Sequence, residues 1–189
     1  NNVVLEAGSR YKYTVKVNTT GLTLEGCTIG NWVDGGGESG EAEDLGYSIQ
    51  NDGSYTVYNA NGLMNVAELV NGGKTDINIT LDKNIDLTGK DWTPIGTDYD
   101  NAYTGTFDGG GHTITGLTVT TNDQYAGLFG YLGNFGNAAA TVKNVVMEGI
   151  QITCNHRSGY AGGVAGFSWG TIENCSVSGL SLIHISEPT

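Results

Sequence analysis

Alternating apolar and polar residues mark the first part of the chain as β structure. In YKYTVKV, residues 11–17, tyrosines and valines alternate with lysines and a threonine, which is the period of a half-buried strand. A turn over residues 18–21 and a second strand, LTLEGCTI, residues 22–29, follow. Because an isolated hairpin is only marginally stable in water, we expect these strands to be the end of a larger β-domain.

The next segment predicts a second hairpin. The stretch YSIQNDGSYTVYN, residues 47–59, places Asn51, Asp52 and Gly53 between two runs rich in β-forming residues. This composition is typical of a tight turn between antiparallel strands.

One helix is predicted, over residues 61–71. Its apolar residues recur at helical spacing, namely Leu63, Val66, Ala67 and Val70. Asn59 or Asn61 can cap its start, and Gly72 and Gly73 can end it in a left-handed conformation. We expect this one-sided helix to cover the first coil of the following β structure and to prevent edge-to-edge aggregation.

The rest of the chain carries an internal repeat. NIDL, GLTV, NVVM and NCSV begin at residues 84, 116, 144 and 174, and each places a turn-former before two apolar residues at alternate positions. These units align as one column of equivalent residues, and in the last three units a further apolar residue lies three positions before the first apolar one. The motifs PIG, LFG and VAG, each ending in glycine, form a second column. The members are Ile85, Leu87, Leu117, Val119, Val145, Met147, Cys175 and Val177, then Ile114, Val142 and Ile172, then Gly96, Gly130 and Gly166. Two columns in one order with irregular gaps predict stacked coils with loops of variable length.

The repeat therefore predicts an all-β fold, a right-handed parallel β-helix or β-solenoid with one short N-terminal capping helix, preceded by a partial β-sandwich-like remnant. Leu117, Val145 and Cys175 are expected to stack in one continuous core. The bends at Gly116, Asn144 and Asn174 are expected to be left-handed or in the bridge region. Aligned asparagines are also expected to form a side-chain ladder.

The predicted domain organisation has five parts: strands of a truncated β-domain over residues 1–33, an acidic glycine-rich linker over 34–46, the hairpin and helix over 47–75, the solenoid over 76–179, and a tail over 180–189. The tail, LSLIHISEPT, matches the translation of a common transposon-derived sequencing adapter and is excluded from the fold prediction; a genuine final strand is the alternative. The first residues lack an initiator methionine and a signal-peptide core. The chain is thus expected to be cut from a longer protein at both ends.

Composition and charge exclude several classes of partner. The formal net charge is −12, and the 8 Lys and Arg residues form no cluster, which disfavours nucleic acids and anionic lipid surfaces. No apolar run approaches the roughly 20 residues of a membrane span. Cys27, Cys154 and Cys175 have no metal-ligand spacing and are odd in number, so neither a disulfide framework nor a zinc site is implied.

The segment AGGVAGFSWGTIENCSVSG, residues 161–179, resembles the GLUG repeat of bacterial surface proteins and of the non-catalytic part of some IgA-cleaving metallopeptidases. The preceding YTVYNANGLMNVAELVNGGKTDINITLDKNIDLTGKDWTPIG and GTFDGGGHTITGLTV are similar to the segment that commonly introduces such repeats, so that the resemblance covers residues 47–179. Residues 3–36 are similar to the closing strands of fimbrillin-like proteins, which are lipid-anchored or pilus-associated in Gram-negative bacteria. The resemblance implies an exported surface protein with an adhesin or stalk role, and it supplies no catalytic motif.

Carboxylates suggest no active site. Parallel β-helices also host lyases and glycosidases, whose chemistry needs converging carboxylates or a base beside a bound cation. Asp98, Asp100 and Asp108 are the densest candidates, but they lie in loop contexts where Asp is an ordinary turn former. Arg157 and Lys143 are not expected to lie beside an acidic cluster as a catalytic base.

Other polar residues have ordinary structural interpretations. His112 follows three glycines without a nucleophile or base at motif spacing, and the pair Cys154 and His156 lacks further metal ligands. Cys175 is expected to be a buried free thiol. The acidic run of Glu38, Glu41, Glu43 and Asp44 lacks calcium-loop spacing and reads as a solvated linker. We expect no catalytic residue, no metal and no cofactor.

Aromatic residues supply the remaining candidate site. Six lie outside the core columns: Tyr99, Tyr103, Tyr125, Phe135, Tyr160 and Trp169. Some of them can stack on sugar rings along one face of the solenoid; equally, they can pack loops only. Of the six, Tyr99, Tyr103, Tyr125, Tyr160 and Trp169 are the predicted glycan contacts.

The sequence thus predicts a non-catalytic structural or adhesive module of a secreted, cell-surface bacterial protein, located at the outer-membrane surface. Its expected partners are host or environmental glycans or surface proteins. Two alternatives stay open: the accessory region of a secreted IgA-peptidase-like protease or glycan-degrading enzyme, and a glycan-binding module.

Overall fold

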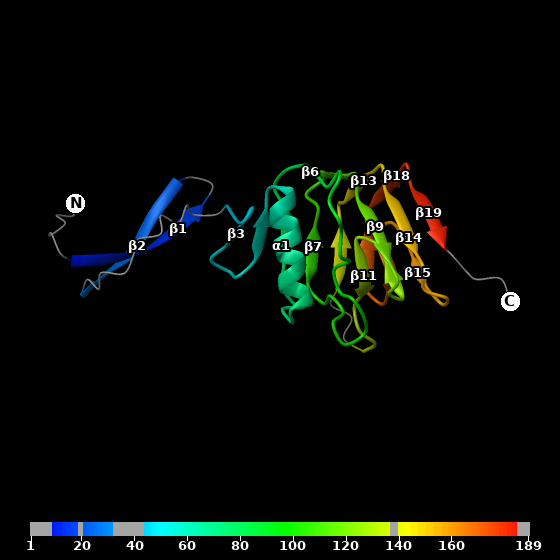
Figure 1. Cartoon of the computed structure of the whole chain (residues 1–189), viewed down its shortest axis with the longest axis horizontal. Helices are drawn as coiled ribbons and strands as arrows, with labels where there is room; N and C mark the ends of the chain where they lie inside the picture. Colours follow the sequence, from blue (N-terminus) through cyan, green and yellow to red (C-terminus); the bar gives the residue numbers. More distant parts are fainter. Residues whose placement is uncertain (1–8, 19–20, 32–43, 137–139, 185–189) are drawn as a thin grey trace. The chain divides into compact units, whose positions relative to one another are not determined.

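The computed structural model describes residues 9–18, 21–31, 44–136 and 140–184 (Figure 1). The chain divides into two compact units, Asn1–Glu43 and Asp44–Thr189. In the first unit, β1 (Ser9–Asn18) pairs with β2 (Gly21–Asn31) in an antiparallel hairpin. This confirms the two strands predicted from the alternating pattern.

The second unit begins with the predicted hairpin and helix. β3 (Tyr47–Ile49) pairs antiparallel with β4 (Tyr55–Val57), and the turn between them contains Gly53 at φ +84°. Helix α1 (Ala60–Asn71) is capped by Asn59, whose side chain accepts a hydrogen bond from the Gly62 backbone N–H at 2.8 Å. The predicted hairpin and the predicted helix with its Asn59 cap are therefore both confirmed.

The end of α1 and the domain boundary differ in detail from expectation. Gly72 has φ −84°, so only Gly73, at φ +107°, takes the left-handed conformation expected of both glycines. The compact unit also begins at Asp44, inside the predicted linker. Asp44 accepts a hydrogen bond from the Tyr58 hydroxyl at 2.6 Å, and a Cβ on Gly46 would lie 2.3 Å from the Gly62 nitrogen, so these residues pack onto the start of α1.

The remaining strands are short, and most run parallel to their neighbours. They are β5 (Ile79–Leu81), β6 (Ile85–Asp86), β7 (Thr106–Asp108), β8 (Thr113–Thr115), β9 (Thr118–Thr121), β10 (Tyr125–Ala126), β11 (Phe129–Leu132), β12 (Thr141–Lys143), β13 (Val146–Glu148), β14 (Gln151–Cys154), β15 (Tyr160–Ala161), β16 (Ala165–Ser168), β17 (Thr171–Glu173), β18 (Ser176–Ser178) and β19 (Ser181–His184). The second unit is therefore mostly β structure with one short helix, which confirms the all-β expectation.

The strands recur in a fixed order. One sheet runs β17-β12-β7-β5-β4-β3, a second β18-β13-β8-β6, and a third β19-β14-β9. Two further pairs are β10-β15 and β11-β16. The chain passes through the first two sheets in β5 and β6, through all five from β7 to β11 and again from β12 to β16, and through the first three from β17 to β19. We call these four passages the first to the fourth circuit.

Apolar residues of successive circuits pair directly in the register of the sheets. Phe107, Val142 and Ile172 are partners in the first sheet. Other partners are Ile85, Ile114, Met147 and Val177 in the second sheet, and Val119, Ile152 and Leu182 in the third. Each of these three sheets thus contributes its own apolar column to one core, although the last members, Ile172, Val177 and Leu182, are exposed.

This register corrects part of the predicted repeat. Val145 and Cys175 both lie between the first and second sheets, whereas Leu117 lies between the second and third. Leu117 and Val145 are fully buried, but they occupy different corners and do not stack. The prediction of a Leu117–Val145–Cys175 column is therefore wrong at Leu117. The bend between the first and second sheets and the bend between the second and third sheets both contain a left-handed residue followed by an apolar one, so the sequence pattern does not distinguish them.

The glycine column is confirmed. Ile95 bridges Phe129, and Phe129 pairs with Ala165, so that Gly96, Gly130 and Gly166 follow at matching positions. A Cβ on Gly130 would lie 2.4 Å from the Gly96 carbonyl oxygen, a distance that real Cβ atoms do not adopt. Glycine is required here because the backbones of neighbouring circuits approach closely.

Residues 181–184 form a strand, β19, although they lie in the tail that is assigned to a sequencing adapter. β19 pairs in parallel with β14, with Ile152 opposite Leu182. Backbone pairing needs no particular side chains, so an extended segment can add to the open edge of β14. The adapter origin of residues 180–189 stays a prediction.

Candidate functional site: an aromatic face

An aromatic cluster lies over β10, β11, β15 and β16. Tyr125 and Tyr160 are direct partners in the β10–β15 pair, and their rings stack with centroids 5.7 Å apart and an interplanar angle of 18°. Tyr131 and Phe167 are partners in the β11–β16 pair and stack at 4.8 Å and 29°. Two circuits therefore place two columns of aromatic rings side by side.

The two columns contact each other edge to face. The Tyr125 ring lies 5.0 Å from that of Tyr131 at 90°, and the Tyr160 ring lies 5.8 Å from that of Phe167 at 79°. Such edge-to-face pairs stabilise by about 0.5–1.5 kcal/mol beyond their buried area. The four rings hold one another in place, so little side-chain freedom is left to lose when a ligand binds.

Three more aromatic residues extend this block. Tyr99 contacts the Tyr131 ring at 6.0 Å and 88°, and the indole Nε1 of Trp169 donates a hydrogen bond to the Tyr131 hydroxyl at 3.1 Å. Phe135, 73% exposed, contacts Trp169 at 5.3 Å. We call these seven residues, Tyr99, Tyr125, Tyr131, Phe135, Tyr160, Phe167 and Trp169, the aromatic face. Tyr99, Phe135, Tyr160 and Trp169 are exposed, so the face offers aromatic surface to solvent.

The structure corrects one predicted contact and adds two residues. Tyr103 is fully buried, and its hydroxyl donates a hydrogen bond to the Ile77 carbonyl at 2.9 Å, so it cannot contact a glycan. Burial also raises the pKa of its phenol. Tyr131 and Phe167 were not predicted. The glycine column contained the signal, since each residue directly follows a column glycine, Gly130 or Gly166.

A polar pocket adjoins Tyr125. It has a volume of about 340 Å³ and is lined by Thr97, Asp98, Asp123, Gln124 and Tyr125. The Gln124 amide donates to the Ser158 carbonyl at 3.3 Å, which joins the pocket wall to the loop before β15. Carboxylate, amide and hydroxyl groups here face the same space as an aromatic ring.

The two carboxylates of this pocket have different structural roles. The Asp98 carboxylate accepts hydrogen bonds from the backbone N–H groups of Asn101 at 3.0 Å and Asp100 at 2.9 Å. The Asn101 N–H lowers the pKa of Asp98, so this carboxylate is ionised at neutral pH. Asp123 accepts a hydrogen bond from the Thr121 hydroxyl at 3.0 Å. Asp98 therefore holds its own loop, and Asp123 is the freer of the two to meet a ligand.

Another cavity of about 340 Å³ lies between α1 and the segment of Asp91, Trp92 and Thr93. Its aromatic residue, Trp92, is buried and donates its indole N–H to the Leu128 carbonyl at 3.1 Å. This tryptophan serves packing, which leaves the aromatic face as the stronger candidate site.

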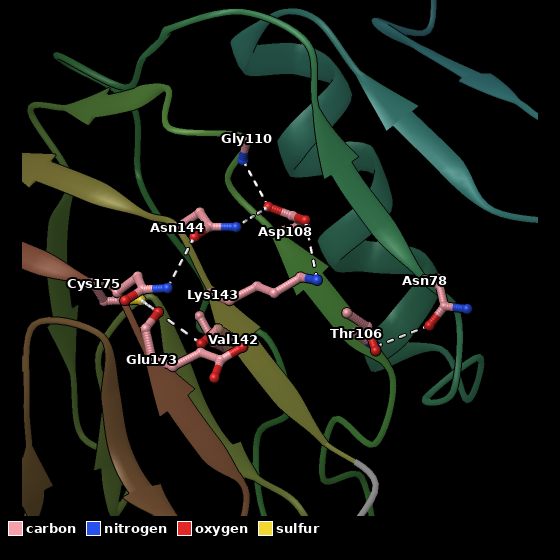
Figure 2. A network of polar contacts seen from close by, with 10 residues as sticks. Asn78, Thr106, Asp108, Gly110, Val142, Lys143, Asn144, Glu173 and Cys175 are labelled. Atoms are coloured by element: carbon pink, nitrogen blue, oxygen red, sulfur yellow. Dashed lines mark hydrogen bonds and ion pairs between the residues drawn. The ribbon is translucent and has the colours of Figure 1, made fainter.

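A polar ladder occupies the corner between the first and second sheets (Figure 2). The Asn174 amide donates to the Asn144 Oδ1 at 3.4 Å, and the Asn144 amide donates to the Asp108 Oδ1 at 3.0 Å. Lys143 Nζ lies 3.4 Å from the Asp108 Oδ2. Asn144 and Asn174 have φ +54° and +51°, so the expected left-handed asparagines and their ladder are both confirmed.

The predicted chemical candidates are dispersed. Asp108 ends β7 and pairs with Lys143, and Asp98 holds its own loop. Within the described ranges, no three His, Cys, Asp or Glu side chains gather so as to hold a metal ion. Of the proposed acidic run, Glu38, Glu41 and Glu43 lie outside the described residues.

Histidines and cysteines occupy structural positions. The His156 Nδ1 accepts a hydrogen bond from the Ser158 backbone N–H at 3.1 Å, and His112 is partly buried in the loop before β8. Cys154 is a buried free thiol, and Cys175 is free as predicted but only partly buried. Among the described residues, no helix is both long and apolar enough to cross a bilayer.

Comparisons with known proteins give two partial relatives. Halomucin from Haloquadratum walsbyi is 39% identical over 110 residues, which are 53% of this chain and 1% of that protein. A "Putative Gly-rich membrane protein" from Evansella cellulosilytica is 34% identical over 130 residues, 65% of this chain and 14% of that protein. The chain thus spans a small part of each relative. No described protein family and no solved structure matches it.

Proposed function

We propose that this chain is a non-catalytic structural and adhesive module of a secreted cell-surface protein. The aromatic face would supply the contact surface, and the stacked circuits would supply the rigid support. The observation that carries this proposal is the pairing of Tyr125 with Tyr160 and of Tyr131 with Phe167, which builds one ordered aromatic surface from two circuits.

The support is proposed to be a right-handed parallel β-helix. The chain visits the same sheets in the same order, from β7 to β11 and from β12 to β16, and parallel partners join the two circuits. Crossovers between parallel strands are right-handed in nearly all proteins, which gives the proposed hand. α1 packs against β3, β4 and β6 and would cap the first circuit.

The surface location is supported by the relatives and by composition. The name of one relative contains the word membrane, and the other is named Halomucin, although this chain matches only 14% and 1% of them. A formal net charge of −12 favours solubility in an aqueous exterior. We assign the circuits to GLUG-type repeats and residues 1–33 to a fimbrillin-like β-domain as part of the same proposal, which places the protein at a bacterial outer surface.

An accessory region of a secreted protease or glycan-degrading enzyme is the second candidate. The resemblance of residues 161–179 to repeats found beside some peptidase domains favours it. The complete reading frame distinguishes the two candidates. A zinc-protease helix motif elsewhere in the frame would favour the enzyme, whereas further repeats with a lipoprotein signal would favour the adhesin.

The adhesive function is tested with microspheres that carry the purified chain. Their retention under flow is measured on a panel of immobilised glycans and proteins. We expect retention on at least one surface, and a loss of retention for the double variant Phe135→Ala and Trp169→Ala. The control is Leu45→Ala with Ile49→Ala, which removes two exposed apolar side chains in or just before β3, the edge strand of the first sheet. Retention no greater than that of albumin-coated spheres on every surface would contradict the proposal.

A further inference from the structure

We propose that the aromatic face and the pocket beside Tyr125 bind a polysaccharide of amino-hexoses that carry free, positively charged amino groups. This inference rests on the adhesive function proposed above and names its ligand. Three observations support it: the aromatic columns, the polar groups of the pocket, and the charge of both the pocket and the chain.

The aromatic columns match a repeating ligand. Tyr125 and Tyr160 lie on strands that are direct partners, and adjacent strands are about 4.8 Å apart. An extended chain of linked hexoses advances by a similar length for each sugar, so consecutive sugars can meet equivalent aromatic residues of consecutive circuits. The apolar C–H faces and edges of pyranose rings are suited to contact with tyrosine, whose rigid side chain loses little entropy on binding.

The pocket matches the polar groups of a sugar. Ligand pockets commonly have volumes of about 300–1,000 Å³, so a volume of about 340 Å³ fits a single sugar residue. Thr97 and Gln124 offer a hydroxyl and an amide, and Asp98 and Asp123 offer carboxylate oxygens. These groups accept and donate hydrogen bonds, as the hydroxyls of a hexose require.

The charge selects among sugars. Asp98 and Asp123 both line the pocket, which has no cationic residue in its lining, and the chain carries a formal net charge of −12. Uronic-acid polymers would therefore be repelled, whereas an ammonium group would pair with Asp123. A basic peptide shares this charge, but it lacks the rigid repeated rings that the aromatic columns fit.

The test is a calorimetric titration of the full chain with hexamers of glucosamine, N-acetylglucosamine, glucose in β-1,4 linkage, and galacturonic acid, and with hexalysine. We expect the glucosamine hexamer to bind about fivefold more tightly than the two neutral hexamers, from one partly exposed ion pair. We expect no binding of the galacturonic acid hexamer.

Matched variants separate the pocket from the overall charge. Asp123→Asn is expected to weaken glucosamine binding about fivefold and to leave binding of the glucose hexamer unchanged. Asp82→Asn removes the same charge from an exposed residue after β5 and is expected to change neither. Tyr160→Ala is expected to weaken binding of both sugars, and the melting temperature of each variant verifies folding.

Three results would overturn the inference: equal affinity for the glucose and glucosamine hexamers, equal affinity for hexalysine, or no binding of any sugar. The proposed adhesive function fails separately, because microspheres retained on a protein surface would uphold it even if no sugar bound. Equal effects of Asp123→Asn and Asp82→Asn would show that net charge alone, and not the pocket, attracts the amino sugar.

Discussion

Equivalent residues of the third and fourth circuits have opposite exposure. Val142 on β12 is 0% exposed, whereas its partner Ile172 on β17 is 42% exposed. Met147 on β13 is 0% exposed, whereas Val177 on β18 is 36% exposed. The residue types and the register are alike, so the difference arises from the presence or absence of a covering circuit.

The opposite end of the unit shows the same principle in reverse. In the second unit, α1 lies toward one end, and β18 and β19 lie at the other end (Figure 1). Leu63, Val66 and Val70 of α1 are fully buried in the core cluster, so the helix covers an end that would otherwise expose apolar side chains. Burial in this fold therefore depends on neighbouring layers.

The largest expected change in stability comes from placing a charge at the buried member of the pair Val142 and Ile172. Val142→Asp buries an unpaired carboxylate between circuits, so we expect a loss of more than about 3 kcal/mol in the free energy of unfolding. Ile172→Asp, at the partner position, should change it by less than about 0.5 kcal/mol. Urea unfolding measures both, and equal losses would contradict the dependence of burial on a covering circuit.

A smaller loss is expected in the glycine column. Gly130→Ala places a Cβ 2.4 Å from the Gly96 carbonyl oxygen, so the circuits must separate locally, at a cost of about 1–3 kcal/mol. Gly149→Asn is the control, because Gly149 has φ +64° with no other atom within 4 Å of its Cβ position, and asparagine tolerates this conformation. Thermal melting compares them, and an unchanged melt for Gly130→Ala would show that the circuits do not pack closely there.

The ladder of Asn174, Asn144 and Asp108 is expected to contribute less to the free energy of unfolding than the glycine column. Asn144→Gly keeps the left-handed backbone but removes the hydrogen bonds to Asp108 and from Asn174, with an expected loss of about 1 kcal/mol. Asn174→Gly removes a ladder contact at the uncovered circuit and should cost less. A larger loss at Asn174 would reverse the order that the comparison of the two circuits predicts.

The smallest effect concerns acid stability. Partial burial raises the pKa of Asp108, but the hydrogen bonds from Asn144 and Gly110 and the charge of Lys143 outweigh it and hold this pKa below the ordinary value of 3.8. A carboxylate with a lowered pKa stabilises the fold above its unfolded pKa, and this contribution disappears as the pH falls below 3.8 toward the folded pKa. Asp108→Asn should therefore flatten the dependence of stability on pH in this window. An unaltered pH dependence would show that the ladder does not retain the charge of Asp108.

Local features of the fold were predictable from the sequence. The Asn59 cap, the hairpin at Gly53 and the left-handed asparagines each follow from residues close together in the chain. The glycine column follows from a motif that recurs at Gly96, Gly130 and Gly166. Glycine and asparagine are informative because few other residues adopt these backbone conformations.

The register between the second and third circuits was not predictable in the same way. GLTV and NVVM look alike, yet Ile114 pairs with Met147 and not with Val142. Loops of different length join the strands, so a local sequence match does not show which two sheets a given bend connects. The aromatic face was found only in part for a different reason. Tyr131 and Phe167 follow Gly130 and Gly166 of the predicted column, but their contacts with Tyr125 join separate strands.

Disulfide cross-linking tests the register most directly. Thr120 pairs with Thr153 in the β9–β14 sheet, whereas the sequence repeat alone would align Thr120 with Glu148. With Cys27, Cys154 and Cys175 replaced by serine, Thr120→Cys with Thr153→Cys should form an intramolecular disulfide on mild oxidation, because directly paired strand residues lie within bonding reach. Thr120→Cys with Glu148→Cys should remain reduced. Rapid closure of the second pair, with the first pair reduced, would contradict the stacking of circuits described here.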